Sequence, residues 1–418
     1  MRRAEGPRPM RLSAPTRPLP QIELVMLLAA LMSMMAFSID SIMPALPEIA
    51  REFIPGAPSR AQLTISAFVL GTGVGQIFIG PFSDSFGRRP ALVLGVALFI
   101  TGALAARVAG NLDALLAFRF VQGLGAASSR IVSQALMRDL YSGREQARIG
   151  SLVFTFFVVI PALAPLIGQW VVLATGGWRG LFSVYFGIGV AVLTWFLLRQ
   201  PETLAPENRR PFRLAPVFSA AVEVLRTPVA LRYLVVASLA FGQLLGYINS
   251  AQQVFTGALD AGTRFPLYFA GIALLSGLSG FLNARVVMRL GMRPLARIAF
   301  GSQAVIATLV WASWHWGLVD LLDTPAQLGL YIIWSVTLFF INGMTFGNIT
   351  ALAMEPLGHI AGTASAVIGA LSSVLAICIA APIGLSFDGT PRALLLGVAL
   401  CSAFAFWLVH RDRARERD

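Results

Sequence analysis

The sequence predicts an all-α polytopic membrane protein with twelve transmembrane helices arranged as two six-helix bundles. Two observations carry most of this prediction: 56% of the 418 residues are hydrophobic, and only 12% are charged. A soluble protein carries about 25% charged residues. The third observation is that the hydrophobic residues fall in blocks of about 20, the length at which a helix spans the hydrocarbon core. A soluble enzyme is therefore excluded.

The hydrophobic blocks define the elements in chain order. The predicted spans are 22–43, 61–82, 90–109, 112–136, 148–173, 180–198, 230–255, 266–287, 295–316, 327–350, 362–384 and 392–410. The first block exceeds the about 7–15 apolar residues of a signal peptide, so an uncleaved first span is expected. The longest break, 199–229, separates an N-terminal bundle (22–198) from a C-terminal bundle (230–410). Residues 1–21 and 411–418 are expected to be cytoplasmic tails and 199–229 a cytoplasmic linker.

The arginines predict the orientation of this topology. Twenty-four of them fall on the side of the two termini and six on the opposite side. Basic residues accumulate on the cytoplasmic side of membrane proteins, so both termini are expected there, in the inner membrane of a bacterial cell. The net charge of +12 fits contact with the lipid bilayer. The arginines are scattered among loops, and no nucleic-acid partner is expected.

Several kinds of chemistry are excluded by the residues that the chain lacks. All 32 basic residues are Arg, so neither a P-loop lysine nor a lysine Schiff base can form. Cys378 and Cys401 lie in separate apolar spans, and the three histidines are far apart, so neither a metal nor a cofactor is expected. An intramembrane enzyme would need a catalytic cluster within one leaflet, and the sequence contains none. Gly71-x-Gly73-x-Gly75 lies inside a span and predicts helix packing.

A faint internal repeat relates the two halves. The segment GRRP at Gly87 to Pro90 follows the second span, and GMRP at Gly291 to Pro294 follows the eighth. Parallel six-helix repeats are typical of one large class of transporters. The repeat therefore favours a transporter of small molecules.

Asp40, Arg119 and Arg130 are the charged intramembrane candidates, because a charge at the centre of a span costs about 2.5–3.5 kcal/mol. Asp40 and Arg119 are expected at similar depth, where they would form an ion pair that a proton on Asp40 breaks. A static ion pair is the alternative interpretation.

Arg130 and a set of uncharged polar and aromatic residues are candidates for a substrate cavity. Arg130 follows Arg119 by eleven residues, which places it about 20° around the helix and ~16 Å deeper. It either lines an aqueous cavity or extends toward the cytoplasm. The other candidates could line a cavity or join helices; they are Met35, Phe37, Tyr247, Asn249, Gln253 and Asn342.

The run GPFSDSFGRRPALVLG, from Gly80 to Gly95, is the most specific motif. Gly80 is expected to permit a close helix contact, and Gly87 a turn with positive φ. Asp84 is expected to accept hydrogen bonds from the N-terminus of a neighbouring helix, while Arg88 and Arg89 anchor the loop. The motif resembles the loop signature of the major facilitator superfamily, which implies that superfamily's fold.

Other segments resemble the bicyclomycin and chloramphenicol resistance group, Bcr/CflA. They are SIDSIMPALPEIA at Ser38, RFVQGLGAA at Arg119, ALMRDLY at Ala135, GWRGLF at Gly177 and MEPLGHIAGTASA at Met354. The resemblance implies drug export in exchange for protons, with Asp40 and Arg119 as the coupling residues.

The sequence departs from this pattern in two places. Of the glycine- and proline-rich span 5 signature of antiporters, only Pro161, Pro165 and Gly168 are present, and they are expected to kink that helix. The second copy of the loop signature has Met288 where the first has Asp84. Proton coupling is therefore expected in the first half alone.

These observations predict proton-coupled efflux of small hydrophobic compounds by alternating access. In this scheme Asp84, Arg88 and Arg89 stabilise the outward-facing state. The alternative is an exporter of one dedicated metabolite, such as a siderophore, sugar or amino acid, on the same fold. A monomer is expected.

Overall fold

The computed structural model describes residues 19–412, apart from the side chains of residues 144, 147, 151 and 154–158, and within that range it is helical without strands. Of the predicted tails, residues 1–18 and 413–418 lie outside the described residues. The long helices follow the predicted spans in order: α1 Gln21–Asp40, α3 Leu63–Phe86, α4 Arg88–Arg107, α5 Leu112–Leu140, α6 Gly143–Thr175, α7 Arg179–Arg199, α9 Pro228–Gln253, α10 Phe265–Leu290, α11 Met292–His315, α12 Thr324–Met354, α13 Ala361–Leu385 and α14 Arg392–His410.

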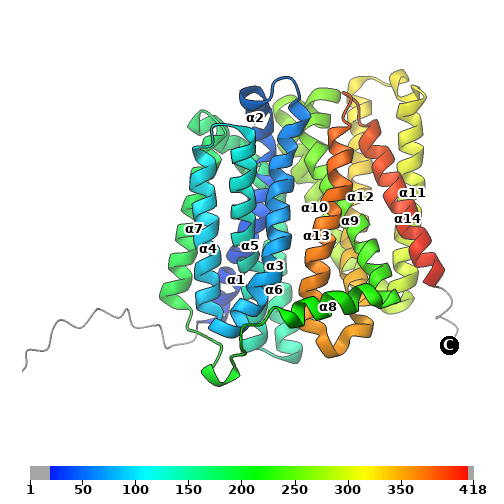
Figure 1. Ribbon diagram of the computed structural model, residues 1–418. Helices are drawn as coiled ribbons and strands as arrows, with labels where there is room; N and C mark the ends of the chain where they lie inside the picture. The colour runs from blue at the N-terminus through cyan, green and yellow to red at the C-terminus, as the bar shows by residue number, and fades with distance from the viewer. Residues whose placement is uncertain (1–18, 413–418) are drawn as a thin grey trace, which may run out of the picture.

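The helices form two bundles that stand side by side, α1 to α7 in one and α9 to α14 in the other (Figure 1). The first short helix, α2 (Leu46–Phe53), lies at one end of the molecule and the second, α8 (Ala215–Arg226), at the other. We call these the α2 end and the α8 end. Nine segments of the described chain are long and apolar enough to cross a membrane, and one of them, Thr324–Leu385, contains both α12 and α13. The chain is thus a multi-pass membrane protein.

Glycines bring α3 and α4 into backbone contact with α5. A Cβ atom built at Gly71 would lie 2.1 Å from the carbonyl oxygen of Phe120, and one at Gly75 would lie 2.6 Å from that of Leu124. On α4, a Cβ atom at Gly95 would lie 2.0 Å from the Ser128 hydroxyl. These glycines pack helices in the way small residues do within membranes, as the sequence predicts.

The two halves meet where α3 lies along α13 and where α6 lies along α10. A Cβ atom at Gly73 would lie 3.0 Å from that of Ser373, and Gln62 fills the space beside Gly384. Nearby, the side-chain amide of Asn249 donates a hydrogen bond of 3.1 Å to the Ser66 hydroxyl. Among the described residues, each ion pair stays within one half or joins a half to the linker.

The linker contains α8, a helix that the sequence analysis does not predict. Val217, Ala220 and Val224 are buried against the C-terminal half. The opposite side is also apolar but exposed, with Phe218, Val222 and Leu225 at helical spacing. In Figure 1, α8 lies across the end of the molecule, roughly perpendicular to the long helices. Two sides of α8 are therefore apolar: one contacts the C-terminal half, and the other faces outward.

The start of the predicted C-terminal tail is packed into the bundle. Asp412 is 4% exposed and forms ion pairs with Arg232 and with Arg293, whose Nε lies 2.9 Å from Oδ2. The hydroxyl of Tyr233 also donates to Asp412, at 2.8 Å. These contacts tie the end of α14 to α9 and α11.

Candidate functional site

Arg119 lies in the interior of the N-terminal half, on α5 toward the α2 end. Its Nε donates to the carbonyl oxygen of Thr64 (3.2 Å), Nη1 to Oε1 of Gln122 (2.8 Å) and Nη2 to the carbonyl oxygen of Ser38 (3.0 Å). The ring of Phe68 faces the guanidinium, with Cζ 4.4 Å from the ring centroid. Three helices therefore hold this cation through carbonyl dipoles and an aromatic face.

Asp40 is the last residue of α1 and is 6% exposed. The predicted ion pair with Arg119 is not formed in this structure, because Arg119 binds the backbone of Ser38, two residues before Asp40. Within residues 19–412 the Asp40 carboxylate has no hydrogen bond and no ion pair. The structure thus brings both residues to one region without direct contact, and their pairing at another stage of transport stays a prediction.

Tyr185 of α7 completes this region, which we call the Asp40 site: Asp40, Ser41, Arg119, Gln122 and Tyr185. The hydroxyl groups of Tyr185 and Ser41 are 2.8 Å apart. The sequence analysis missed both Tyr185 and Gln122. Gln122 could have been found, because it lies three residues after Arg119 on the same helix face. Tyr185 carries no such signal, since only the fold brings α7 to α1.

Predicted cavity residues on α1 belong to the packing around this site. Phe37 is buried and contacts Tyr185 edge-on, with ring centroids 5.9 Å apart, while Met35 is partly buried against the core. Gly168 of α6 packs on the same turn, because a Cβ atom there would lie 2.0 Å from the Ser41 carbonyl oxygen.

The prolines predicted to kink span 5 lie inside α6. Pro161 and Pro165 are both within Gly143–Thr175, and the helix continues through both of them without interruption. Each proline removes one N–H donor from the helix ladder.

Arg130 lies on α5 deeper than Arg119 and is partly buried. Within the described part of the chain its guanidinium has no ion pair, no hydrogen bond and no aromatic contact. The two predicted cations of α5 therefore have opposite environments. Every guanidinium nitrogen of Arg119 donates a hydrogen bond, and no guanidinium nitrogen of Arg130 does so to a described residue.

The predicted polar residues of the C-terminal half, Asn249, Asn342 and Gln253, differ in their hydrogen-bond partners. Asn249 joins the halves through Ser66, and Asn342 donates to the Leu338 carbonyl oxygen of its own helix at 2.9 Å. Gln253 is partly buried, and its Oε1 has no hydrogen-bond partner among the described residues. The Oδ1 atoms of Asn249 and Asn342 are likewise buried without a partner there.

Tyr247 belongs to an aromatic cluster that the sequence analysis recognised only in part. Its ring centroid lies 6.1 Å from that of Tyr331, 6.0 Å from that of Trp334 and 5.1 Å from that of Phe339. Trp334 Nε1 and the hydroxyls of Tyr247 and Tyr331 are buried without a hydrogen bond of standard geometry in the described chain. Buried polar atoms usually have partners, and the nearest polar groups to the Tyr247 hydroxyl are the side chains of Ser335 and Tyr331.

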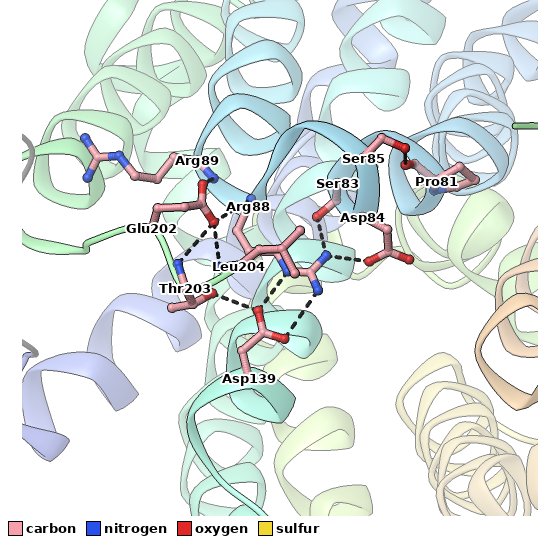
Figure 2. A network of polar contacts seen from close by, with 10 residues as sticks. All are labelled: Pro81, Ser83, Asp84, Ser85, Arg88, Arg89, Asp139, Glu202, Thr203 and Leu204. Carbon is pink, nitrogen blue, oxygen red and sulfur yellow. Dashed lines mark hydrogen bonds and ion pairs between the residues drawn. The ribbon is translucent and has the colours of Figure 1, made fainter. Parts of the chain in front are cut away.

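The loop between α3 and α4 is the centre of a polar network at the α8 end (Figure 2). The Arg88 guanidinium donates to the Ser83 hydroxyl (2.9 Å), to Asp84 (2.6 Å) and to Asp139 at the end of α5 (2.8 Å). Gly87 has φ of 112°, as predicted for this turn. We call this set the Arg88 network.

Glu202 of the linker caps α4 from outside the helix. Its two carboxylate oxygens accept the backbone N–H groups of Arg88 and Arg89, each at 2.9 Å. A carboxylate at a helix N-terminus is favourable. The Arg89 side chain donates to the carbonyl oxygens of Gln200 and Leu197. The sequence analysis missed Glu202 and Asp139, although Asp139 stands in the ALMRDLY segment.

Two expectations for the loop motif were wrong. A Cβ atom at Gly80 would meet no atom within 4 Å, so Gly80 makes no close helix contact. The Asp84 carboxylate binds the side chain of Arg88 on the next helix. Among the described residues it accepts no backbone N–H from a helix N-terminus, because the nearby guanidinium is the stronger donor.

A cavity of about 340 Å³ at the α2 end is lined by Glu48, Glu52, Trp178 and Arg179 among others. Arg179 Nη2 lies 2.6 Å from Glu52 Oε1, and the Trp178 backbone N–H donates to Glu48. Over the described residues, no group of three or more His, Cys, Asp or Glu side chains could hold a metal ion. The acids here stabilise the loop between α6 and α7.

Comparison with known proteins identifies the family to which this fold and these motifs belong. Residues 26–381 match the model of the Major Facilitator Superfamily. The chain is 30% identical over 404 residues to a bicyclomycin resistance protein homolog of Haemophilus influenzae, covering 94% of this chain and 97% of that protein. It is 28% identical over 374 residues to multidrug resistance protein D of Escherichia coli, covering 84% and 86%.

Solved structures show the same fold. The xylose transporter XylE from E. coli, in a partially occluded inward open conformation, superposes with a TM-score of 0.70 at 13% identity, covering 94% of this chain and 97% of that one. The family match covers most of the chain. The chain belongs to the major facilitator superfamily of transporters.

Proposed function

We propose that this protein exports small hydrophobic compounds from the bacterial cytoplasm across the inner membrane, in exchange for protons. The relatives named for bicyclomycin and multidrug resistance support drug efflux. The bundles at 22–198 and 230–410 would move against each other in alternating access. The α8 end, which carries the linker and most arginines, would face the cytoplasm.

The observation that carries proton coupling is the isolation of Asp40. It is buried in the membrane-spanning region, and no described residue donates to its carboxylate. An ionised carboxylate without partners is costly there, so a proton is its natural ligand. When the site opens, loss of that proton would let Asp40 compete with the Ser38 carbonyl oxygen for Arg119.

The driving force is sufficient for such a cycle. Each inward-moving proton releases about 2.3 kcal/mol per 100 mV of membrane potential.

The Arg88 network would hold α3, α4, α5 and the linker together as one body while the halves rotate. The aromatic cluster around Tyr247 would contact the exported compound.

The test uses inside-out vesicles that hold a pH gradient, to which a panel of antibiotics and dyes is added. We expect some compounds to collapse the gradient with the wild type but not with Asp40→Asn, which has nearly the same size and cannot ionise. Asp113→Asn, an exposed aspartate at the start of α5, is the matched control and should behave as the wild type.

Two results would oppose the proposal. Gradient collapse by the same compounds with Asp40→Asn would show that the proton travels elsewhere. If no compound acts although the wild type is folded in the vesicles, broad drug export is excluded and a dedicated metabolite exporter takes its place.

A further inference from the structure

Arg130 is a cation that the fold leaves without a counter-ion. It is partly buried, and its guanidinium has no hydrogen bond and no ion pair with any side chain or backbone group that the structure describes. Arginine offers five N–H donors and stays charged at any ordinary pH. A desolvated charge inside a membrane protein is expensive unless something neutralises it.

The chain itself supplies no acidic side chain as a counter-ion for Arg130. Of its 20 acidic residues, only Glu23, Asp40 and Asp113 lie inside a predicted span, and each is within three residues of a span end. Asp40 is at the α2 end of α1, beside the hydrogen-bond shell of Arg119. Arg130 lies about 16 Å from Arg119 along α5, which is too far for an ion pair with that carboxylate. The counter-ion must therefore come from outside the protein.

The position of Arg130 indicates where that counter-ion enters. Arg119, which is about 20° away around the same helix, points toward α1 and α3, so Arg130 faces the same side. Gln134 and Arg138, one and two turns further on, are exposed, and Arg138 has no ion pair in the described chain. A polar track thus leads along α5 from the α8 end to Arg130.

We propose that Arg130 binds an oxyanion carried by the transported compound, and that anionic or zwitterionic aromatic compounds are therefore the preferred cargo. Guanidinium binds carboxylate through two parallel hydrogen bonds. Arg138 would attract the anion at the cytoplasmic mouth, and Arg130 would hold it within the membrane. This assignment rests on the proposed export function and names its substrate class.

A lipid phosphate offers the same chemistry as a substrate carboxylate. The depth of Arg130 disfavours it, since Arg130 precedes the end of α5 at Leu140 by ten residues, or ~15 Å. Binding is therefore measured in nanodiscs of zwitterionic lipid with and without added anionic lipid. Substrate binding that survives the anionic lipid supports our assignment, and binding abolished by it would assign Arg130 to a headgroup.

The experiment compares 2-naphthoate with 2-naphthamide, which have the same ring and nearly the same size but differ in charge. Dissociation constants are measured by tryptophan fluorescence on the purified full-length protein. We expect Arg130→Gln to weaken naphthoate binding about tenfold or more, with less than about a twofold change for naphthamide. Arg130→Lys should retain part of the preference. Arg289→Gln removes an exposed charge near the α8 end of α10 and should change neither constant.

The outcomes separate this inference from the proposed function. If Arg130→Gln binds both probes as the wild type does, or if the wild type does not bind naphthoate, the oxyanion site is wrong even when neutral drugs collapse the pH gradient. If naphthoate binding depends on Arg130 but no compound collapses the gradient, the oxyanion site stands and proton exchange fails.

Discussion

Two arginines of one helix show how strongly the surroundings decide the role of a residue. Arg119 donates to Thr64, Gln122 and Ser38 and lies against Phe68, so its charge is spread over fixed dipoles. Arg130 has no such partners in the described chain. The first is built into the fold, and the second is available to a ligand. Sequence spacing places both on one face but cannot distinguish these roles, because the partners of Arg119 come from helices distant in sequence.

Helix packing at the residue scale can be tested with a pair of glycines from α3. Gly71→Val should lower the free energy of unfolding by about 1–3 kcal/mol or prevent folding, because its Cβ would overlap the Phe120 carbonyl oxygen. Gly80→Val is the control, since no atom lies within 4 Å of its Cβ position. Thermal denaturation in detergent compares the two variants. Equal melting temperatures would contradict the close packing of α3 on α5.

At the scale of elements, the linker is held by the helices that it connects. Glu202 accepts the first backbone N–H groups of α4, Asp139 of α5 accepts the Thr203 hydroxyl, and the Arg210 N–H donates to the Asp84 carbonyl oxygen. On the other side, α8 packs its buried side onto the C-terminal half. The linker thus follows both bundles.

Removal of the Glu202 carboxylate should loosen this linker. Glu202→Ala removes the cap of α4, which is worth about 1–2 kcal/mol, so cleavage by trypsin after Arg209 or Arg213 should become roughly tenfold faster for each 1.4 kcal/mol lost. Glu207→Ala, an exposed acid in the same linker, is the control. Fragments are followed by mass spectrometry. Equal cleavage rates for the two variants would show that Glu202 does not hold the linker.

At the scale of the whole molecule, the halves meet around α3 and α13 through small and uncharged residues. Gly73 lies against Ser373, Gln62 fills the space beside Gly384, and Asn249 reaches Ser66. Such an interface can separate without exposing an unpaired buried charge, which would be costly. It therefore suits two rigid bodies that must part in each cycle.

A disulfide across this interface should arrest transport. Gly73→Cys with Ser373→Cys, in a background where Cys378 and Cys401 are Ser, places two cysteines whose Cβ atoms would lie 3.0 Å apart. Disulfides need about 3.5–4.5 Å, so a small shift is enough. Oxidation should abolish efflux in vesicles, and a reductant should restore it. Each single cysteine variant is the control, and full transport by the cross-linked protein would contradict a moving interface.

The sequence predicted the large features well, for a physical reason. Each helix that crosses a membrane must be apolar over about 20 residues, so the order of the twelve helices could be read directly, as could the Gly87 turn with its φ of 112°. The Asp40 site was predicted in part. Tyr185 and Glu202 reach their places through tertiary packing, and neither carries a local signal. The predicted pair of Asp40 with Arg119 assumed contact from similar depth, and the Ser38 carbonyl oxygen occupies that place instead.

The outward side of α8 has a consequence for how the protein senses its surroundings. Phe218, Val222 and Leu225 are 63%, 47% and 48% exposed, and at the membrane surface they would enter the boundary between headgroups and acyl chains. Thr227 then leads directly into α9, the helix that carries Tyr247. We therefore expect the thickness and lateral pressure of the bilayer to act on the C-terminal half through α8, which would make the lipid composition of the cell an input to the transport cycle.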